Sequence, residues 1–233
     1  MGRGQALRGA DLSLPGYDRV VGERTGFPRE LLAARPEDVA PRLLGSLLVR
    51  REPAGCETIA RIVETEAYHQ DDPASHSFRG RTERTRVMFG DPGMLYVYFT
   101  YGMHWCANVS TQPAGTGSAV LLRAGVVLAG RELVRARRGP KHPARDLLRG
   151  PARLTQGLDI SGHHDGLDLL DPASEVRLER DAWAPPANAT VAGPRTGVRQ
   201  AADLAWRFHL AGVPEVSRHV RHPRAVSDAG RRG

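Results

Sequence analysis

The sequence lacks several features that mark particular protein classes. Its 233 residues include only two cysteines, Cys56 and Cys106, which excludes a disulfide scaffold or a cysteine-rich zinc site and indicates a reducing cytoplasm. No run approaches the eighteen apolar residues of a membrane-spanning helix, and the N-terminus lacks an apolar stretch of signal-peptide length. The P-loop, the dinucleotide fingerprint and the Gly-x-Ser-x-Gly motif are absent. We therefore expect a cytoplasmic protein without a membrane partner.

Lysine is almost missing, although the chain is basic. Lysine and arginine number 33 against 26 acidic residues, so the formal net charge is +7, and Lys141 is the only lysine. A basic surplus favours a polyanionic partner, of which nucleic acid is the commonest. Residues 131–153 carry eight basic and two acidic side chains, which fits either a solvated surface or a track for DNA phosphates.

Helical and strand patterns are interspersed without regular βαβ alternation. Helices are predicted over residues 28–32, 36–44, 130–138 and 151–158, and strands over residues 47–49, 59–68, 119–128 and 206–210. The stretch 94–110 holds two β-prone aromatic runs around Tyr101-Gly102, a pattern typical of a hairpin. We therefore expect an α+β fold, a single compact domain around a mostly antiparallel sheet with a protruding β-hairpin.

Composition also suggests where the folded domain begins and ends. Residues 1–25 are rich in Gly and Arg without an apolar period, and we expect a mobile basic N-terminal arm there. Residues 26–222 hold the predicted elements and are long enough to bury one core. Residues 223–233 are polar and are expected to form a loose C-terminal tail.

Aromatic residues gather in one part of the chain. Eight of the thirteen Phe, Tyr and Trp residues lie between Tyr68 and Trp105, which fits either a locally aromatic core or a platform on which bases stack. Tyr101 lies at the expected hairpin tip, where a large ring cannot easily reach a core, and a wedge between base pairs is one use for it. A two-residue turn would place Asn108 on the other sheet face from Tyr98, whereas a bulge, a twist or a longer turn would place the two on one face.

The predicted strand over residues 61–68, RIVETEAY, has acidic residues at alternate positions. A period of two places Glu64, Glu66 and Tyr68 on one face, which is either a solvated surface or the wall of a cleft where a carboxylate acts as a base. Arg123 interrupts the apolar run 119–128, and a buried guanidinium is costly unless it is paired. One of the glutamates is a candidate partner, and an edge-strand position is the alternative.

One motif looks like a metal site but is incomplete. His163, His164 and Asp165 are adjacent, yet no further ligand pattern completes a metal-binding set. We expect no metal and no cofactor.

Several segments resemble the alkyladenine (3-methyladenine) DNA glycosylase family. They are RIVETEAYHQDDPASHSFRGRT, VMFGDPGMLYVYFTYGMHWCANVS, AVLLRA and, over residues 150–160, GPARLTQGLDI. The resemblance runs from about residue 27 to residue 217. It implies one α/β domain around an antiparallel sheet, whose hairpin enters the minor groove while a damaged nucleotide is flipped into a pocket.

The resemblance also implies roles for individual residues. Glu66 would be the general base that activates water, and Arg123 would help to hold that water. Tyr68, His76 and Tyr98 would line the pocket and stack on the base, Asn108 would exclude guanine by crowding its exocyclic amine, and Tyr101 would fill the gap left by the flipped nucleotide.

The expected activity is removal of damaged purines from double-stranded DNA in base excision repair. The substrates implied are 3-methyladenine, 7-methylguanine, hypoxanthine and ethenoadenine. Because Lys141 lies outside the proposed site segments, an amine nucleophile is lacking and a monofunctional hydrolase that leaves an abasic site is expected. We expect a monomeric, nucleoid-associated bacterial enzyme without an obligate protein partner. The alternatives are a non-catalytic nucleic-acid-binding module and a small-molecule hydrolase.

Overall fold

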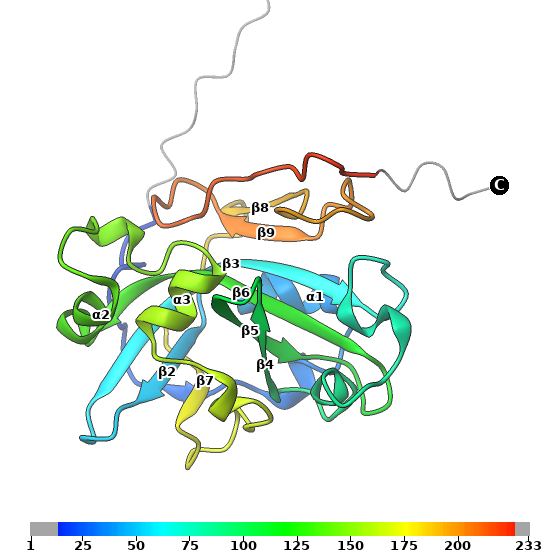
Figure 1. Cartoon of the computed structure of the whole chain (residues 1–233). Coiled ribbons are helices and arrows are strands. Elements are labelled where there is room, and N and C mark those ends of the chain that lie inside the picture. The colour runs from blue at the N-terminus through cyan, green and yellow to red at the C-terminus, as the bar shows by residue number, and fades with distance from the viewer. Residues whose placement is uncertain (1–13, 227–233) are drawn as a thin grey trace, which may run out of the picture.

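A long central strand, β3 (Glu57–His69), organises the sheet (Figure 1). One edge of β3 pairs with β6 (Ser118–Ala129), and the other pairs first with β2 (Leu47–Arg51) and then with β9 (Arg207–Leu210). The apolar and β-branched residues of β3 suit a strand that is bonded on both edges. Nearly all of its side chains are buried, the charged ones included.

The structure is a computed structural model that describes residues 14–226, and over these residues it is a single α+β domain. The sheet order is β1-β7-β2-β3-β6-β5-β4, with β9 joining β3 to β8, and each pairing between these strands is antiparallel. The remaining strands are β1 (Thr25–Gly26), β4 (Leu95–Thr100), β5 (His104–Ser110), β7 (Val176–Arg180) and β8 (Thr190–Gly193). The predicted fold class is confirmed.

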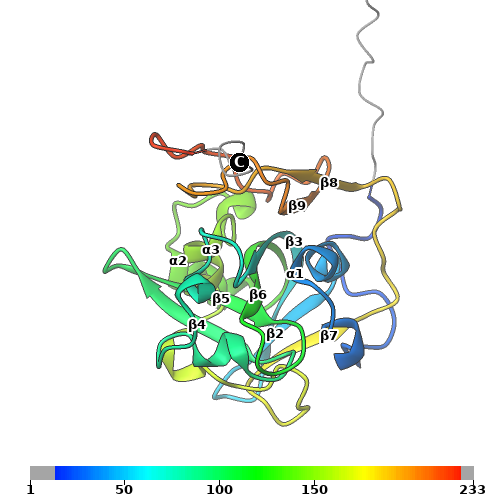
Figure 2. The same ribbon diagram turned by 90° about the vertical axis from the view of Figure 1, so that its right-hand side faces the viewer.

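The helices are short and lie on both sides of the sheet. They are α1 (Pro36–Val39), α2 (Arg131–Arg138) and α3 (Pro151–Gly157), with 3₁₀ turns at Arg29–Leu31, Ala40–Leu43, His76–Arg79, Arg86–Phe89, Ala144–Asp146 and Gly162–His164. In Figure 2, α2 and α3 lie on one side of β6 and α1 on the other. The continuous helix predicted over residues 36–44 is wrong, because Pro41 lacks an N–H and its ring opposes an α-helical turn.

The β4–β5 hairpin protrudes from the domain, as predicted (Figure 2). Thr100 pairs with His104, so three residues form the turn, which is the longer turn that the sequence left open. Tyr101 and Gly102 both have positive φ, at 50° and 65°. The longer turn pairs Tyr98 with Cys106, which brings Tyr98 and Asn108 to one face of the sheet.

The outer segments pack on the domain within the described residues. Leu14 is buried, and the Arg61 guanidinium donates to the backbone carbonyls of Tyr17 and Arg19 at 2.9 and 2.7 Å. The described part of the expected mobile arm, residues 14–25, is therefore attached to the domain. In the expected tail, the Val226 N–H donates to the carbonyl of Arg199. Residues 1–13 and 227–233, which make up the rest of the arm and tail, lie outside the described residues.

Candidate active site

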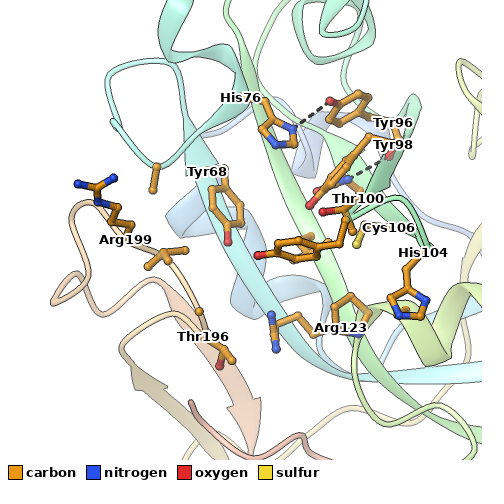
Figure 3. A pocket seen from close by; sticks show the side chains of 18 of the residues that line it. Tyr68, His76, Tyr96, Tyr98, Thr100, His104, Cys106, Arg123, Thr196 and Arg199 are labelled. Atoms are coloured by element: carbon orange, nitrogen blue, oxygen red, sulfur yellow. Dashed lines mark hydrogen bonds between the residues drawn. The ribbon is translucent and has the colours of Figure 1, made fainter. Parts of the chain in front are cut away.

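A pocket of about 480 Å³ opens where β3, the hairpin, α3 and the loop between β8 and β9 meet (Figure 3). Six of the seven residues singled out from the sequence line it: Tyr68, His76, Tyr98, Tyr101, Asn108 and Arg123. Further lining residues include Tyr96, Cys106, Pro151, Ala152 and residues 196–200. The seventh residue, Glu66, lies behind the wall.

Aromatic rings from different elements build one side of the pocket. The rings of His76 and Tyr98 meet edge to face with centroids 4.5 Å apart, and those of Tyr96 and Tyr98 are 5.4 Å apart. His76 Nδ1 lies 3.1 Å from the Tyr96 hydroxyl. In Figure 3, Tyr68 enters the pocket from β3, separately from the hairpin tyrosines. Rings arranged in this way offer flat surfaces to a planar guest.

The ionisable groups on this aromatic side are held in their neutral forms. Burial, reinforced by the charge of Arg84, lowers the pKa of His76 to about 4. Burial raises the pKa of Tyr96 to about 12, and it also raises the pKa of Tyr98 and of the Cys106 thiol. At neutral pH this wall therefore presents uncharged rings and an uncharged thiol.

Asn108 is fixed at the edge of the aromatic wall. Its side chain is buried, and Nδ2 donates to the backbone carbonyl of Tyr96 at 3.0 Å. The two residues are direct partners in the hairpin ladder. Because this bond fixes the amide plane, the position of the group that Asn108 presents to the pocket is fixed as well.

Glu66 is completely buried and does not line the pocket itself. Its carboxylate instead touches three residues that do: Oε2 accepts from the Tyr68 hydroxyl at 2.8 Å and lies 3.1 Å from Arg123 Nη1, and Oε1 accepts from the Thr196 N–H at 2.7 Å. The carboxylate thus lies one hydrogen bond behind the wall. The sequence pattern offered Glu66 as part of the cleft wall itself, whereas the structure places it behind that wall.

Glu64 and Arg123 form a buried ionic network beside Glu66. Glu64 Oε1 accepts from Arg123 Nε at 2.9 Å, from Arg207 Nε at 2.7 Å and from Ser217 Oγ at 2.8 Å. Burial alone would raise the pKa of Glu64, but the two arginines outweigh it and lower that pKa. Burial opposes the charge on Arg123, yet Glu66 and Glu64 raise its pKa. The solvated-face alternative for the two glutamates is wrong, since both are fully buried.

Tyr101 stands at the exposed end of the hairpin, at the pocket rim. It is 84% exposed, and its neighbours Phe99 and Met103 are 45% and 67% exposed. Three large side chains with apolar surface are therefore exposed at the end of the hairpin. An exposed apolar group of this kind marks a surface for interaction.

Sequence reasoning missed the loop that closes the pocket on the side opposite the hairpin. Thr196 contributes its backbone N–H to Glu66, and a backbone group leaves no signature in the sequence. Arg195 packs behind Tyr68 with its Cζ 4.7 Å from the ring centroid. The GPRTGVRQA segment holds Gly and Pro that mark a loop, but nothing in it indicates that this loop reaches β3.

The basic stretch 131–153 is partly occupied by internal contacts. Arg137 pairs with Glu52 at 2.6 Å, and Arg149 donates to the carbonyl of Val216 at 2.9 Å. A second depression of about 490 Å³ lies beside the pocket and shares Pro151 and Ala152 with it. Its charged lining residues are Asp146, Arg149, Arg153 and Arg218, so it carries a net positive charge.

Within residues 14–226, the structure contains neither a candidate metal site nor a candidate membrane span. No group of His, Cys, Asp and Glu side chains there is arranged to hold a metal ion, and His164 Nδ1 instead accepts from the Ser161 N–H at 3.1 Å. No helix in this part of the chain has the length and apolarity needed to cross a bilayer.

Comparison with known proteins decides the family. The family model described as Methylpurine-DNA glycosylase (MPG) matches residues 30–214. This chain belongs to the methylpurine-DNA glycosylase family. A protein of Burkholderia lata named "Putative 3-methyladenine DNA glycosylase" is 48% identical over 82% of this chain and 90% of its own. Proteins of the same name from Nocardia farcinica and Mycobacterium tuberculosis are 48% and 46% identical, over 86% and 84% of this chain and 94% and 95% of theirs.

Family membership agrees with the pocket and settles the class of activity. The methylpurine-DNA glycosylase family consists of hydrolases that bind DNA and act in DNA repair, and the expected class is confirmed at this level. The alternatives of a small-molecule hydrolase and of a non-catalytic module are not favoured by this match. The three relatives named above are bacterial proteins.

Proposed function

We propose that this methylpurine-DNA glycosylase flips alkylated or deaminated purines out of duplex DNA and hydrolyses the N-glycosidic bond with a water activated by Glu66. The observation that carries the proposal is the position of the Glu66 carboxylate, one hydrogen bond behind an aromatic pocket, where Tyr68, Arg123 and Thr196 converge. Cleavage of this bond develops positive charge on the sugar, which a nearby carboxylate stabilises.

A carboxylate at this place has two tasks in the proposed reaction. It accepts a proton from a water that adds to the sugar carbon, bound where its three partners meet the pocket. It also offsets the positive charge that develops on the sugar as the purine leaves with the electron pair of the broken bond. Arg123 holds the carboxylate at 3.1 Å and lines the pocket, so it orients both Glu66 and the water. General-base assistance of this kind contributes about 10²- to 10⁴-fold in rate.

The aromatic wall suits an alkylated base. Alkylation on a ring nitrogen makes a purine cationic or electron-poor, and neutral Tyr68, His76 and Tyr98 rings then attract it, with about 0.5–2 kcal/mol for a cation–π contact. Asn108 is held by its bond to Tyr96 and, in this proposal, crowds the exocyclic amine of a normal guanine. Flipping costs least for a damaged or mispaired base, which adds to the selectivity.

The surface around the pocket supports binding to duplex DNA. The exposed Tyr101 ring at the pocket rim is placed to fill the gap that a flipped nucleotide leaves. The positively charged depression next to the pocket offers arginines to the flanking phosphates.

The chemistry available in the pocket favours a monofunctional enzyme. Lys141 is the only lysine and does not line the pocket. Without a side-chain amine, no Schiff base forms between this wall and the sugar, and the product is an intact strand with an abasic site. The enzyme would act at the first step of base excision repair, as a monomer in the bacterial nucleoid.

A base-release assay tests the proposal. The wild-type protein should release free 3-methyladenine from alkylated duplex DNA, whereas Glu66→Gln should do so about 10²- to 10⁴-fold more slowly. Glu175→Gln is the matched control, because its side chain is 62% exposed and it does not line the pocket. Near wild-type turnover in Glu66→Gln would contradict the assigned mechanism.

The same assay separates the other two classes. Tight binding of lesion-containing DNA without base release in a single turnover indicates a binding module. Salt-insensitive hydrolysis of free nucleosides indicates a small-molecule hydrolase. Duplexes carrying 3-methyladenine, 7-methylguanine, hypoxanthine or ethenoadenine then define the substrate range.

A further inference from the structure

Arg195 lies behind the pocket and takes no part in the chemistry proposed for it. Its side chain is fully buried, and it does not line the pocket. It belongs to the loop between β8 and β9 and precedes Thr196, whose N–H donates to Glu66 at 2.7 Å. A guanidinium is costly to bury, so the groups that surround Arg195 must compensate its charge and indicate its role.

The Arg195 guanidinium packs against two aromatic rings. Its Cζ lies 4.7 Å from the centroid of Tyr68 and 5.3 Å from that of Trp206. Tyr68 lines the pocket, whereas Trp206 and Arg195 do not. Arg195 therefore supports the Tyr68 ring from behind the wall, and a cation against a ring face is an attractive contact.

Hydrogen bonds join the same guanidinium to two further parts of the wall. Nη1 donates to the carbonyl of Ala67 at 2.9 Å and also pairs with Asp72, while Nη2 donates to Asp72 Oδ1 at 3.1 Å. Asp72 Oδ1 also accepts from the Ala74 N–H at 3.0 Å. This bond shapes the turn that leads to His76.

We propose that Arg195 is a positioning residue that fixes the Tyr68 ring and locks three segments of the pocket wall together. The segments are β3, the turn over residues 72–76 and the loop over residues 195–200. The inference rests on the proposed function and deepens it. Arginine is required because a planar guanidinium can bond both Asp72 oxygens while it lies against rings, which the compact lysine ammonium cannot.

A second buried arginine provides a matched control. Arg61 is fully buried, donates to Asp181 at 2.7 and 3.0 Å, and has its Cζ 4.6 Å from the Trp183 ring. It does not line the pocket, and it belongs to the half of β3 that pairs with β2. Arg61→Lys and Arg195→Lys therefore remove the same kind of contact at two places.

The test measures single-turnover base release together with affinity for DNA that carries an abasic site. Misplacement of a reacting geometry by about 1 Å costs about 10²-fold, so Arg195→Lys should release base about 10- to 100-fold more slowly. Its affinity for abasic DNA should stay at the wild-type value, because no base then occupies the pocket. Arg61→Lys should keep the wild-type release rate. Wild-type release by Arg195→Lys, or equal slowing in both variants, overturns the proposal.

A second variant and a second readout do not depend on this substitution or on activity. Trp206→Leu removes one ring beside Arg195 and leaves the pair with Asp72, and it should slow base release in the same direction. Amide exchange at Thr196 should accelerate at least tenfold in Arg195→Lys and remain unchanged in Arg61→Lys. Unchanged exchange in Arg195→Lys contradicts the positioning role. Failure of the wild-type protein to release any purine contradicts the proposed function instead, and the exchange result then still decides the role of Arg195.

Discussion

Glu64 and Glu66 lie two residues apart on β3 and are both fully buried, but the groups that surround them differ. Glu64 lies on what we call the closed side: the backbone and hydroxyl of Ser217 and the side chains of Arg123 and Arg207 satisfy its carboxylate, and of these partners only Arg123 lines the pocket. Glu66 lies beside the pocket, and its partners Tyr68, Arg123 and Thr196 all line the opening. The same side chain can stabilise the fold in one region and remain available for chemistry in the other.

The comparison shows that the partners of a buried carboxylate indicate whether its role is structural or chemical. A carboxylate whose lone pairs are taken by several donors in a closed region contributes to the fold. A carboxylate that is held by pocket-lining groups can replace one of these hydrogen bonds by a bond to a water or a substrate. Substitutions on the closed side should therefore change stability, and those around the pocket should change binding and turnover.

The largest expected effect is on the closed side. Glu64→Gln leaves Arg123 and Arg207 facing one charge fewer, and breaking a buried ion pair costs about 3–5 kcal/mol in the free energy of unfolding. The urea midpoint of the variant should fall accordingly, and further than that of Glu66→Gln. Equal midpoints for Glu64→Gln and the wild-type protein would show that the network does not stabilise the fold.

A pocket variant should have a smaller effect, and on binding. Tyr98→Leu keeps an apolar side chain but removes a stacking ring, and loss of base stacking costs about 1–3 kcal/mol. The dissociation constant for lesion-containing duplex should rise by about 5- to 150-fold, while the affinity for undamaged duplex stays the same. A uniform loss on both duplexes would assign Tyr98 to the fold.

A substitution at the hairpin tip should change DNA binding without changing the stability of the fold. Tyr101 is 84% exposed, so Tyr101→Ala should change the free energy of unfolding by less than about 0.5 kcal/mol. Dissociation of lesion-containing DNA should nevertheless become faster, because the gap beside a flipped nucleotide is no longer filled. Tyr101→Phe serves as the control and should dissociate like the wild-type protein. Identical dissociation of the alanine variant would remove the wedge assignment.

The smallest effect concerns acidification of the pocket. Burial, together with Arg84, lowers the pKa of His76 to about 4, whereas the residue in the unfolded chain titrates at about 6.5. Between these values the unfolded chain binds the proton and the folded protein does not, so His76 lowers stability as the pH falls. His76→Gln should lose less stability than the wild-type protein between pH 7 and pH 5 in urea titrations. A parallel loss in both proteins would contradict this assignment.

The elements that depend on local pattern were predictable, and those that depend on pairing partners were not. The apolar run 119–128 and the β-prone residues 59–68 predict strands because each segment contains its own pattern, and both strands are present. The short strand β8 was missed, since it forms by pairing with β9. The sequence left the length of the hairpin turn open, because the turn depends on positive φ at both Tyr101 and Gly102, a backbone state that a residue other than glycine rarely shows.

The sequence by itself determined the fold class, the family and six of the residues that line the pocket. These features follow from the sequence because side-chain identity and spacing are local properties. The glutamates, the tyrosines and Arg123 could each be identified as candidates from residue type and position. Only the tertiary structure decided that Glu66 lies behind the wall, that Glu64 is enclosed, and that Arg195 and the Thr196 N–H complete the site. These relations join β3 to a loop some 130 residues away along the chain, and they arise from packing and backbone geometry, for which the sequence has no local pattern.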